Sequence, residues 1–349
     1  MSCTSWRAAR VGAICSPRPT SSTSPTFDWC ARRVPLIRWA RSGAPDLERS
    51  APCANLARVI QPLVTIRDAS QRPFPELDWR ARLARLEEWL APHGRVVVAY
   101  SGGVDSSVVL RVARGVLGDG ALGVIGRSDS YSASELEQAL EQAAGFGAEV
   151  EIVTTGELSD PVFRSNPEDR CYHCKTELYR ELLQVARRIG AEVIVDGMIA
   201  DDLVDWRPGR RAAAESGVRS PLAELGFTKA DVRQTARWLG IASAQKPASP
   251  CLASRIPYGV EITQEKLGMI ERAEELLRSL GFRELRVRHH EELARVEVPL
   301  AELDRVLEPG TRQKLVEGLK SLGYRYVTLD LEGFRSGNLN PDHLRVKTT

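Results

Sequence analysis

Seven residues, Ser-Gly-Gly-Val-Asp-Ser-Ser at positions 101–107, constrain the fold of this chain more than any other segment. They follow a run at 95–100, apolar after its arginine, that predicts a buried parallel strand, and a helical pattern begins at Val108. Gly102 and Gly103 accept positive φ angles, so the loop can turn backbone N–H groups inward, where the next helix also points its N-terminus. The segment therefore predicts a strand, a phosphate-binding loop and a helix in direct succession.

Apolar runs continue to alternate with helical patterns along the chain, which sets the fold class. Strands are expected at 122–126, 149–154 and 193–197, and helices at 134–146 (opened by a serine cap), 174–189 and 228–239. This alternation predicts an α/β domain over 73–260, with a doubly wound, mostly parallel sheet. Ligands of such sheets bind at the carboxyl ends of the strands, which is where the loop at 101–107 is expected.

A second, smaller α+β domain is expected at 261–340, followed by a tail at 341–349. Its elements are helices at 265–280, 303–307 and 312–322 and strands at 284–289, 294–298 and 326–329.

Residues 1–72 have a different character from the rest. They are rich in Ser, Arg, Pro, Cys and Trp and show no sustained helical or strand period. They also lack the continuous apolar segment of a secretory signal. We expect this extension to be disordered, or to be upstream sequence translated from a start codon assigned too early. N-terminal sequencing of the native protein distinguishes the two.

Composition excludes several functional classes. The chain has 349 residues, 43% hydrophobic and 27% charged, with a net charge of +2. A protein held to nucleic acid mainly by phosphate contacts would be far more basic, so no nucleic-acid partner is favoured. No run of about 18 apolar residues predicts a membrane helix. The odd count of seven cysteines argues against a secreted disulfide framework, and a cytoplasmic location is expected.

The loop at 101–107 lacks the lysine of a Walker loop. Asp105 is acidic, so it more plausibly serves Mg²⁺ or organises the loop than binds phosphate. The alternative is a strand-to-helix turn rich in small residues. The segment closely resembles the PP-loop of the ATP pyrophosphatase superfamily, whose members cleave ATP between the α and β phosphates and transfer AMP. The ATP-binding residues expected from this resemblance are Ser101, Gly102, Gly103, Asp105, Ser106 and Ser107.

Cys171 and Cys174 form a Cys-x-x-Cys pair at a predicted helix start. A helix N-terminus lowers the pKa of a thiol and favours the thiolate, which metal binding and sulfur transfer both require. The pair is compatible with a redox disulfide, a zinc ligand pair or cluster ligands. One such pair cannot close a tetrahedral zinc site, and the neighbouring His173 is expected to be an ordinary loop histidine.

Cys251 lies in a segment that Pro247 and Pro250 predict to be a loop. With Cys171 and Cys174 it could hold three irons of a [4Fe–4S] cluster, leaving the fourth iron open for an extra sulfide. The alternative for Cys251 is a buried structural cysteine.

Taken together, these motifs resemble the LarE family, the pyridinium-3,5-biscarboxylic acid mononucleotide sulfurtransferases of nickel-pincer cofactor biosynthesis. The resemblance covers roughly residues 75–340. The segments that carry it lie at 100–107, 166–175, 196–209 (DGMIADDLVDWRPG), 220–225 (SPLAEL), 246–259 (KPASPCLASRIPYG) and 286–299 (RVRHHEELARVEVP).

The resemblance implies a two-stage reaction that uses ATP and Mg²⁺ on a small-molecule substrate. A carboxylate of the pyridinium mononucleotide is adenylated, sulfur attacks the acyl adenylate, and AMP leaves; two carboxylates are converted in turn. Some members sacrifice the sulfur of the cysteine that matches Cys251, which becomes dehydroalanine. Members with all three cysteines resemble cluster proteins, so the cluster route is expected here. The resemblance also implies a homo-oligomer.

Four residues are expected to bind the substrate. Arg286 and Arg288 lie two apart on a predicted strand and so face the same side, where they can hold a phosphate through charge-assisted bonds. The alternative is a solvated basic face. Ser254 and Arg255, next to Cys251, are expected to contact the substrate as well.

Acidic clusters supply the remaining metal candidates. Asp201, Asp202 and Asp205 follow a predicted strand and are expected to hold Mg²⁺ or ribose, with helix capping as the alternative. Further candidates for a second metal site are Glu274, Glu297 and Asp304.

Two other functions compete with this hypothesis. Some tRNA thiolases also combine a PP-loop with three cysteines around a cluster, but the low net charge and the absence of a recognisable RNA module count against one here. A non-catalytic nucleotide-binding or Fe–S module would bind ATP without forming AMP.

Overall fold

The computed structural model describes residues 78–203, 208–247 and 249–335. All described residues belong to one compact unit. The expectations for residues 1–72, for Asp205 and for the tail at 341–349 therefore lie outside the described residues. None of the described helices is both long and apolar enough to cross a membrane.

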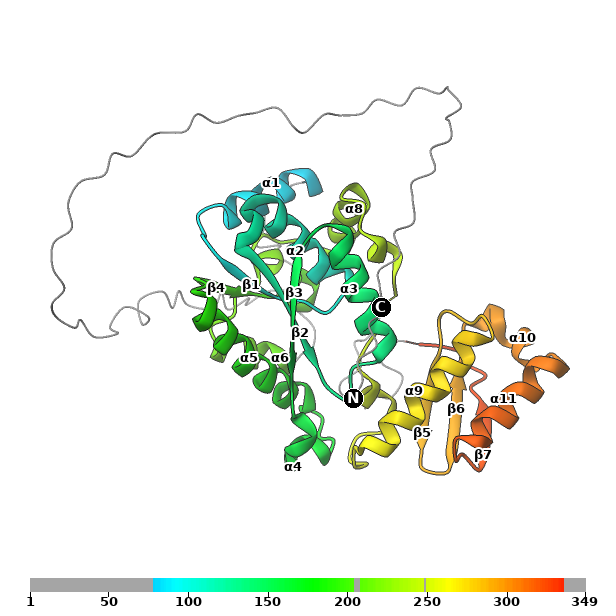
Figure 1. Cartoon of the computed structure of the whole chain (residues 1–349). Coiled ribbons are helices and arrows are strands. Elements are labelled where there is room, and N and C mark those ends of the chain that lie inside the picture. Colours follow the sequence, from blue (N-terminus) through cyan, green and yellow to red (C-terminus); the bar gives the residue numbers. More distant parts are fainter. Residues whose placement is uncertain (1–77, 204–207, 248, 336–349) are drawn as a thin grey trace, which may run out of the picture. The chain divides into compact units, whose positions relative to one another are not determined.

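The first part of the described chain is built on a four-stranded sheet (Figure 1). All neighbouring strands are parallel, and their order is β3-β2-β1-β4. Val97 pairs with Leu122 on one side and with Ile194 on the other, so β1 is central and all four of its residues are buried. The strands are β1 (Val96–Ala99), β2 (Ala121–Arg127), β3 (Glu149–Thr154) and β4 (Val193–Val195).

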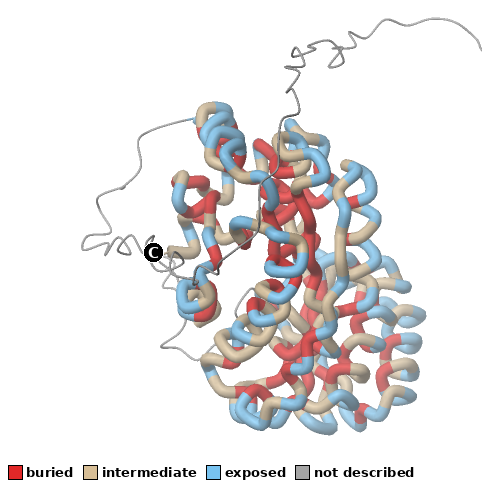
Figure 2. The backbone as a smooth tube through the Cα atoms, turned by 60° about the vertical axis from the view of Figure 1, so that its left-hand side comes forward, coloured by how far each residue is buried: buried red, intermediate tan, exposed pale blue. Residues whose placement is uncertain are grey.

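Helices cover both faces of this sheet, because alternate residues of a strand point to opposite sides. Val96 and Val98 pack with α1, α2 and α8, whereas Val97 and Ala99 pack with α5 and α6. The buried residues accordingly concentrate in the strands and on the helix faces towards them (Figure 2). The helices are α1 (Trp79–Leu90), α2 (Val104–Leu117), α3 (Ala133–Gly145), α4 (Pro161–Arg164), α5 (Arg170–Ile189), α6 (Gly209–Glu215), α7 (Pro221–Glu224) and α8 (Lys229–Trp238).

The remaining described residues form a smaller α+β region with its own core. Its sheet has the order β5-β6-β7, antiparallel between β5 and β6 and parallel between β6 and β7. Apolar side chains of α9 and α11 close one hydrophobic cluster with this sheet. The elements are α9 (Gln264–Ser279), β5 (Arg286–His290), β6 (Leu293–Glu297), α10 (Leu303–Leu307), α11 (Pro309–Ser321) and β7 (Tyr326–Leu329). The predicted fold class, a parallel α/β fold with a small α+β part, is confirmed.

Two predicted helix starts are wrong. The helix expected from residue 174 begins at Arg170, so Cys171 and Cys174 both lie in the first turns of α5. The helix expected to open with a cap at Ser134 begins at Ala133, and its N-cap Ser132 makes no side-chain capping bond. The start of α8 is as predicted: Thr228 and Asp231 form a reciprocal capping box.

Candidate functional site

A cavity of about 640 Å³ lies at the carboxyl ends of β1 and β4. The loop after β1 forms one wall, the segment after β4 a second, and the start of α5 a third. The 3-10 helix Leu252–Arg255 with the residues before it, and two arginines of β5, complete the lining. Phosphate loop, cysteines and arginines, which are far apart in sequence, thus share one cavity.

The phosphate loop folds back on the first turn of α2. The Ser106 hydroxyl lies 3.1 Å from that of Ser101 and donates to the Gly103 carbonyl at 3.2 Å. The Ser101 carbonyl accepts from the Tyr131 hydroxyl at 2.9 Å. Ser101, Gly103 and Ser106 line the cavity, so the loop presents hydroxyls and the N-terminus of a 14-residue helix to any anion bound there.

Ser107 does not face this cavity, contrary to its predicted role in ATP binding. Its side chain is fully buried and donates to the Gly103 carbonyl at 2.7 Å. It also accepts from the Gln142 amide at 2.6 Å, and this amide reaches the Gly102 carbonyl too. Ser107 therefore supports the loop from behind.

Position 102 requires glycine because of both its backbone conformation and the atoms next to it. Its φ is +68°, and a Cβ at this position would lie 2.5 Å from the Cβ of Ala139 in α3. Gly118 also has a positive φ, +57°, but nothing lies within 4 Å of a Cβ built there. Alanine substitutions at these two glycines therefore separate the free-energy cost of backbone strain from that of a steric clash.

We expect Gly102→Ala to lower the unfolding free energy by about 3 kcal/mol and Gly118→Ala by about 1 kcal/mol, because only the first adds a clash to the strain. ATP affinity should fall in Gly102→Ala alone. Urea unfolding and ATP titration measure the two effects. Equal losses in both variants would show that α3 does not hold the loop.

The acidic residues near the loop divide between pairing, capping and lining the cavity. Asp105 lines the cavity and forms an ion pair with Lys229 at 2.7 Å. Asp201 accepts from the Lys229 backbone N–H at 2.8 Å, which is the capping alternative to metal binding. Asp202 accepts from the Ile199 N–H at 3.1 Å and also lines the cavity. Of the two described aspartates of this cluster, only Asp202 therefore faces the cavity.

The three predicted sulfur residues come together from two segments. Cys171 and Cys251 line the cavity, and Cys174 and Cys251 both pack against one small apolar cluster. All three are free thiols. No three His, Cys, Asp or Glu side chains in the described part of the chain are placed to hold a single metal ion.

The thiolate expected at the start of α5 is not what the environment of Cys174 favours. Burial raises the pKa of the Cys174 thiol well above its ordinary value, and Glu157, Cys251 and Cys171 raise it further. Desolvation here outweighs the field of the helix N-terminus. The predicted lowering of this thiol pKa is therefore wrong for the protein without a bound ligand.

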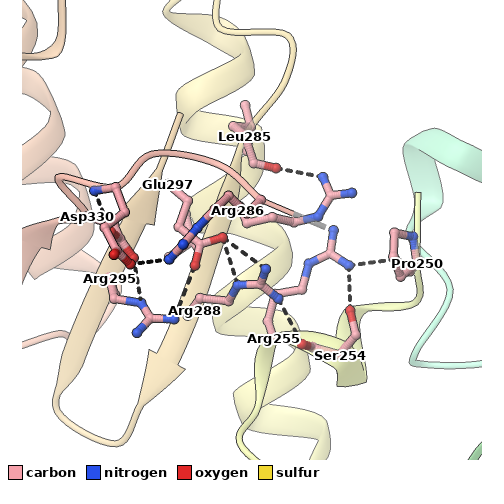
Figure 3. Close-up of polar contacts among 12 residues, drawn as sticks. Pro250, Ser254, Arg255, Leu285, Arg286, Arg288, Arg295, Glu297 and Asp330 are labelled. Carbon is pink, nitrogen blue, oxygen red and sulfur yellow. Dashed lines mark hydrogen bonds and ion pairs between the residues drawn. The ribbon is translucent and has the colours of Figure 1, made fainter. Parts of the chain in front are cut away.

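Arg255 is buried beneath the cysteine loop, so its expected substrate contact is not supported. Only 1% of the residue is exposed, and its Nε and Nη2 donate to the two oxygens of Glu274 at 2.8 and 3.0 Å. Its Nη1 donates to the Pro250 carbonyl at 2.5 Å (Figure 3) and to the Cys251 carbonyl at 3.0 Å. We therefore assign Arg255 to positioning the Cys251 backbone.

Arg286 and Arg288 line the same cavity wall, as their spacing on one strand predicts (Figure 3). Arg288 donates to a buried carboxylate oxygen of Glu297 at 2.9 and 3.0 Å and to the Ser254 carbonyl at 3.0 Å. Burial lowers the pKa of Arg286 to about 10, and the positive charges of Arg255 and Arg288 add to this effect. This concentration of positive charge favours an anion in the cavity.

Glu274 and Glu297, the further metal candidates, neutralise arginines instead. Both are fully buried. Glu274 pairs with Arg255 and Arg278, and Glu297 with Arg288 and Arg295. A buried carboxylate already held by two guanidinium groups is a poor metal ligand, so a second metal site at these residues is not supported.

Comparisons with known proteins identify relatives of this chain. No family model matches the chain. A pyridinium-3,5-bisthiocarboxylic acid mononucleotide synthase of Lactiplantibacillus plantarum is 42% identical over 247 residues, 70% of this chain and 89% of that protein. The chain belongs to the LarE family. An uncharacterised protein of Synechocystis is 45% identical over 260 residues, 74% of this chain and 97% of that protein.

The similarity of the LarE-family chain to a more distant enzyme is confined to part of its length. A GMP synthase of Aeropyrum pernix is 30% identical over 203 residues, 52% of this chain and 39% of that protein. This relationship agrees with the parallel sheet and the phosphate loop, which mark a PP-loop α/β domain.

Sequence analysis did not identify several residues that line the cavity of this LarE-family protein. Asp196, at the end of β4, accepts from the Ser220 hydroxyl at 2.7 Å and from the Tyr179 hydroxyl at 3.2 Å. Its place after a strand was an available signal. Lys175, Arg170 and Tyr258 also line the cavity, but without the fold they were indistinguishable from surface residues.

Proposed function

We propose that this enzyme uses ATP to convert the carboxylates of pyridinium-3,5-biscarboxylic acid mononucleotide into thiocarboxylates through an acyl adenylate. The observation that carries the proposal is that the phosphate loop and two of the three cysteines line one cavity. The printed name of the Lactiplantibacillus relative, a bisthiocarboxylic acid mononucleotide synthase, supports the choice of substrate. Because the product of that relative has two thiocarboxylates, two carboxylates of each substrate molecule must be converted in turn.

In the first step ATP is held with its phosphates at the N-terminus of α2. Ser101, Ser106 and the backbone of Gly103 supply donors, and Asp105 and Asp202 are the candidates for Mg²⁺. A substrate carboxylate oxygen attacks the α-phosphorus, the bond to pyrophosphate breaks, and pyrophosphate leaves with the electron pair. Arg286 and Arg288 hold the phosphate of the substrate mononucleotide, because two neighbouring guanidinium groups suit a dianion.

In the second step sulfur attacks the acyl carbon. The new C–S bond forms as the C–O bond to AMP breaks, and AMP leaves with the electron pair. Cys251 is the residue around which this step is organised, since it lines the cavity and Arg255 fixes its carbonyl. If Cys251 itself is the donor, removal of its Cα proton with cleavage of its Cβ–S bond leaves dehydroalanine.

The thiols also suit a [4Fe–4S] cluster by the chemistry of the donor set. Three cysteines gather from α5 and the loop before Leu252–Arg255, and Cys171 and Cys251 face the cavity. A cluster held by Cys171, Cys174 and Cys251 would keep one iron open to carry an additional sulfide. In either route these residues hold the reactive sulfur beside the nucleotide.

We expect AMP to form only when ATP and the biscarboxylate mononucleotide are both present, with one AMP per thiocarboxylate. Protein purified without oxygen should contain about four irons per chain, lost in a Cys171→Ala/Cys174→Ala variant, and its mass should not change on turnover. Nucleotide chromatography, iron and sulfide assays and intact mass spectrometry measure these quantities.

Each other outcome points to a different conclusion. Absence of iron, with loss of one H₂S per chain at Cys251, would establish sacrificial donation. ATP binding without AMP formation would refute the proposal and leave a non-catalytic nucleotide-binding module.

A further inference from the structure

Arg170 is a buried cation that the proposed mechanism does not yet use. It is the first residue of α5 and lines the cavity together with Cys171, Cys251 and Tyr258. Only 6% of the residue is exposed. A guanidinium this deeply buried at a cavity wall needs a partner for its charge.

Neutral groups hold the Arg170 side chain in one place. Its Nη1 donates to the side-chain Oδ1 of Asn166 at 3.0 Å, and its Cζ lies 4.4 Å from the centre of the Tyr258 ring. Asn166 is fully buried with a positive φ of 56°, and its amide donates to three carbonyls, those of Ile256, Pro257 and Val260. The guanidinium is therefore positioned by a rigid, saturated support.

The charge of Arg170 is not balanced by this support. Within 78–203, 208–247 and 249–335, no carboxylate forms an ion pair with Arg170, and its buried Nε has no hydrogen-bond partner. The buried Arg255, which does not line the cavity, shows the contrasting case, because it pairs with the buried Glu274. At Arg255 the chain supplies a buried glutamate, whereas at Arg170 it supplies a cavity wall.

We infer that Arg170 recognises the carboxylate of the substrate that is not reacting. This inference rests on the proposed function and deepens it. The reacting carboxylate loses its charge on adenylation, whereas its partner across the ring stays anionic throughout, as a carboxylate in the first round and a thiocarboxylate in the second. A fixed guanidinium at the cavity wall, with no carboxylate of the described chain balancing its charge, matches an anion that persists and does not move. Arg170 thereby selects a dicarboxylate over a monocarboxylate.

The test compares two substrates that differ only in this group. AMP formation is measured with the biscarboxylate mononucleotide and with nicotinic acid mononucleotide, which lacks the second carboxylate. Arg170→Gln, whose amide can still donate to Asn166, should lower kcat/KM for the biscarboxylate about 10- to 100-fold and change the monocarboxylate by less than about twofold. Arg170→Lys keeps the positive charge but loses the planar guanidinium. Its kcat/KM for the biscarboxylate should therefore lie between the values for wild type and Arg170→Gln.

Arg180→Gln is the matched control, since it makes the same change on the exposed face of α5 and should alter neither substrate. Equal losses on both substrates in Arg170→Gln would overturn the inference and give Arg170 a structural role. Equal losses accompanied by loss of iron would assign it to the cysteine site, and would overturn the inference as well.

Failure of the proposed function is recognised separately. If the wild-type enzyme forms no AMP, calorimetric binding of pyridine-3,5-dicarboxylate and pyridine-3-carboxylate still tests Arg170. Preference for the dicarboxylate in wild type and its loss in Arg170→Gln would support the recognition site without the reaction. The same weak affinity for both acids in both proteins would overturn it.

Discussion

Cys251→Ser is expected to abolish thiocarboxylate formation while pyrophosphate release continues, because pyrophosphate leaves in the first step and AMP only in the second. The side chain of Cys251 lines the cavity but makes no capping bond to the 3-10 helix that follows, so a hydroxyl fits without disturbing the loop. The phosphate loop and the arginines of β5 are untouched, so the adenylation step keeps its binding groups. Because the variant loses the sulfur at the centre of the second step, we expect thiocarboxylate to fall by about 10³-fold or more.

Mass spectrometry of the thiocarboxylate product and measurement of released pyrophosphate separate the two steps. Cys171→Ser and Cys174→Ser tell the two sulfur routes apart: loss of thiocarboxylate in all three variants indicates a shared cluster, and loss in Cys251→Ser alone indicates direct donation. Ser279→Ala, on the exposed part of α9, is the control and should change neither step. Thiocarboxylate formation by Cys251→Ser within tenfold of wild type would remove Cys251 from the mechanism.

Glu274→Ala is expected to destabilise the fold more than any other single change considered. The fully buried Glu274 accepts from Arg255 at 2.8 and 3.0 Å, from Arg278 at 3.1 Å and from the Val287 backbone N–H at 3.2 Å. Its removal leaves the Arg255 guanidinium buried without a counter-charge, which costs about 3–5 kcal/mol, or about 10 °C in Tm.

Thermal and urea unfolding measure this loss, with Glu275→Ala as the control, because Glu275 is the exposed neighbour on the same helix. The double variant Arg255→Met/Glu274→Met should recover much of the stability, since it removes both charges together. A Glu274→Ala protein as stable as Glu275→Ala would show that the pair is not needed for the fold.

The pH dependence of stability should follow from the same carboxylate. Burial raises the pKa of Glu274, but the charges of Arg255, Arg286 and Arg278 outweigh it and hold the pKa below its ordinary value of 4.5. A lowered pKa in the folded state contributes stability that is complete above pH 4.5 and is lost as pH falls below it. Wild type should therefore lose stability in acid more steeply than Glu274→Gln.

Local patterns were sufficient for the fold class and the phosphate loop. The apolar run of β1, the glycines of the loop and the helical period of α2 are neighbours in sequence, so their structure follows from short-range rules. The thiols were also found from sequence, because Cys-x-x-Cys at a helix start and a cysteine between prolines are rare local patterns. Their gathering needed the fold, since Cys251 is far along the chain from Cys171 and Cys174.

The sequence by itself therefore determined the sheet, the loop, the cysteines and the common face of Arg286 and Arg288. Only the tertiary structure decided which arginine serves the fold and which faces a ligand. The sequence alone does not distinguish the roles of Arg255 and Arg170. In the structure, Arg255 donates to a buried glutamate 19 residues away, whereas Arg170 donates to a neutral asparagine at the cavity wall. The physical reason is that the role of a buried charge depends on the counter-charge beside it, and long-range packing determines whether that counter-charge comes from the chain or from a ligand.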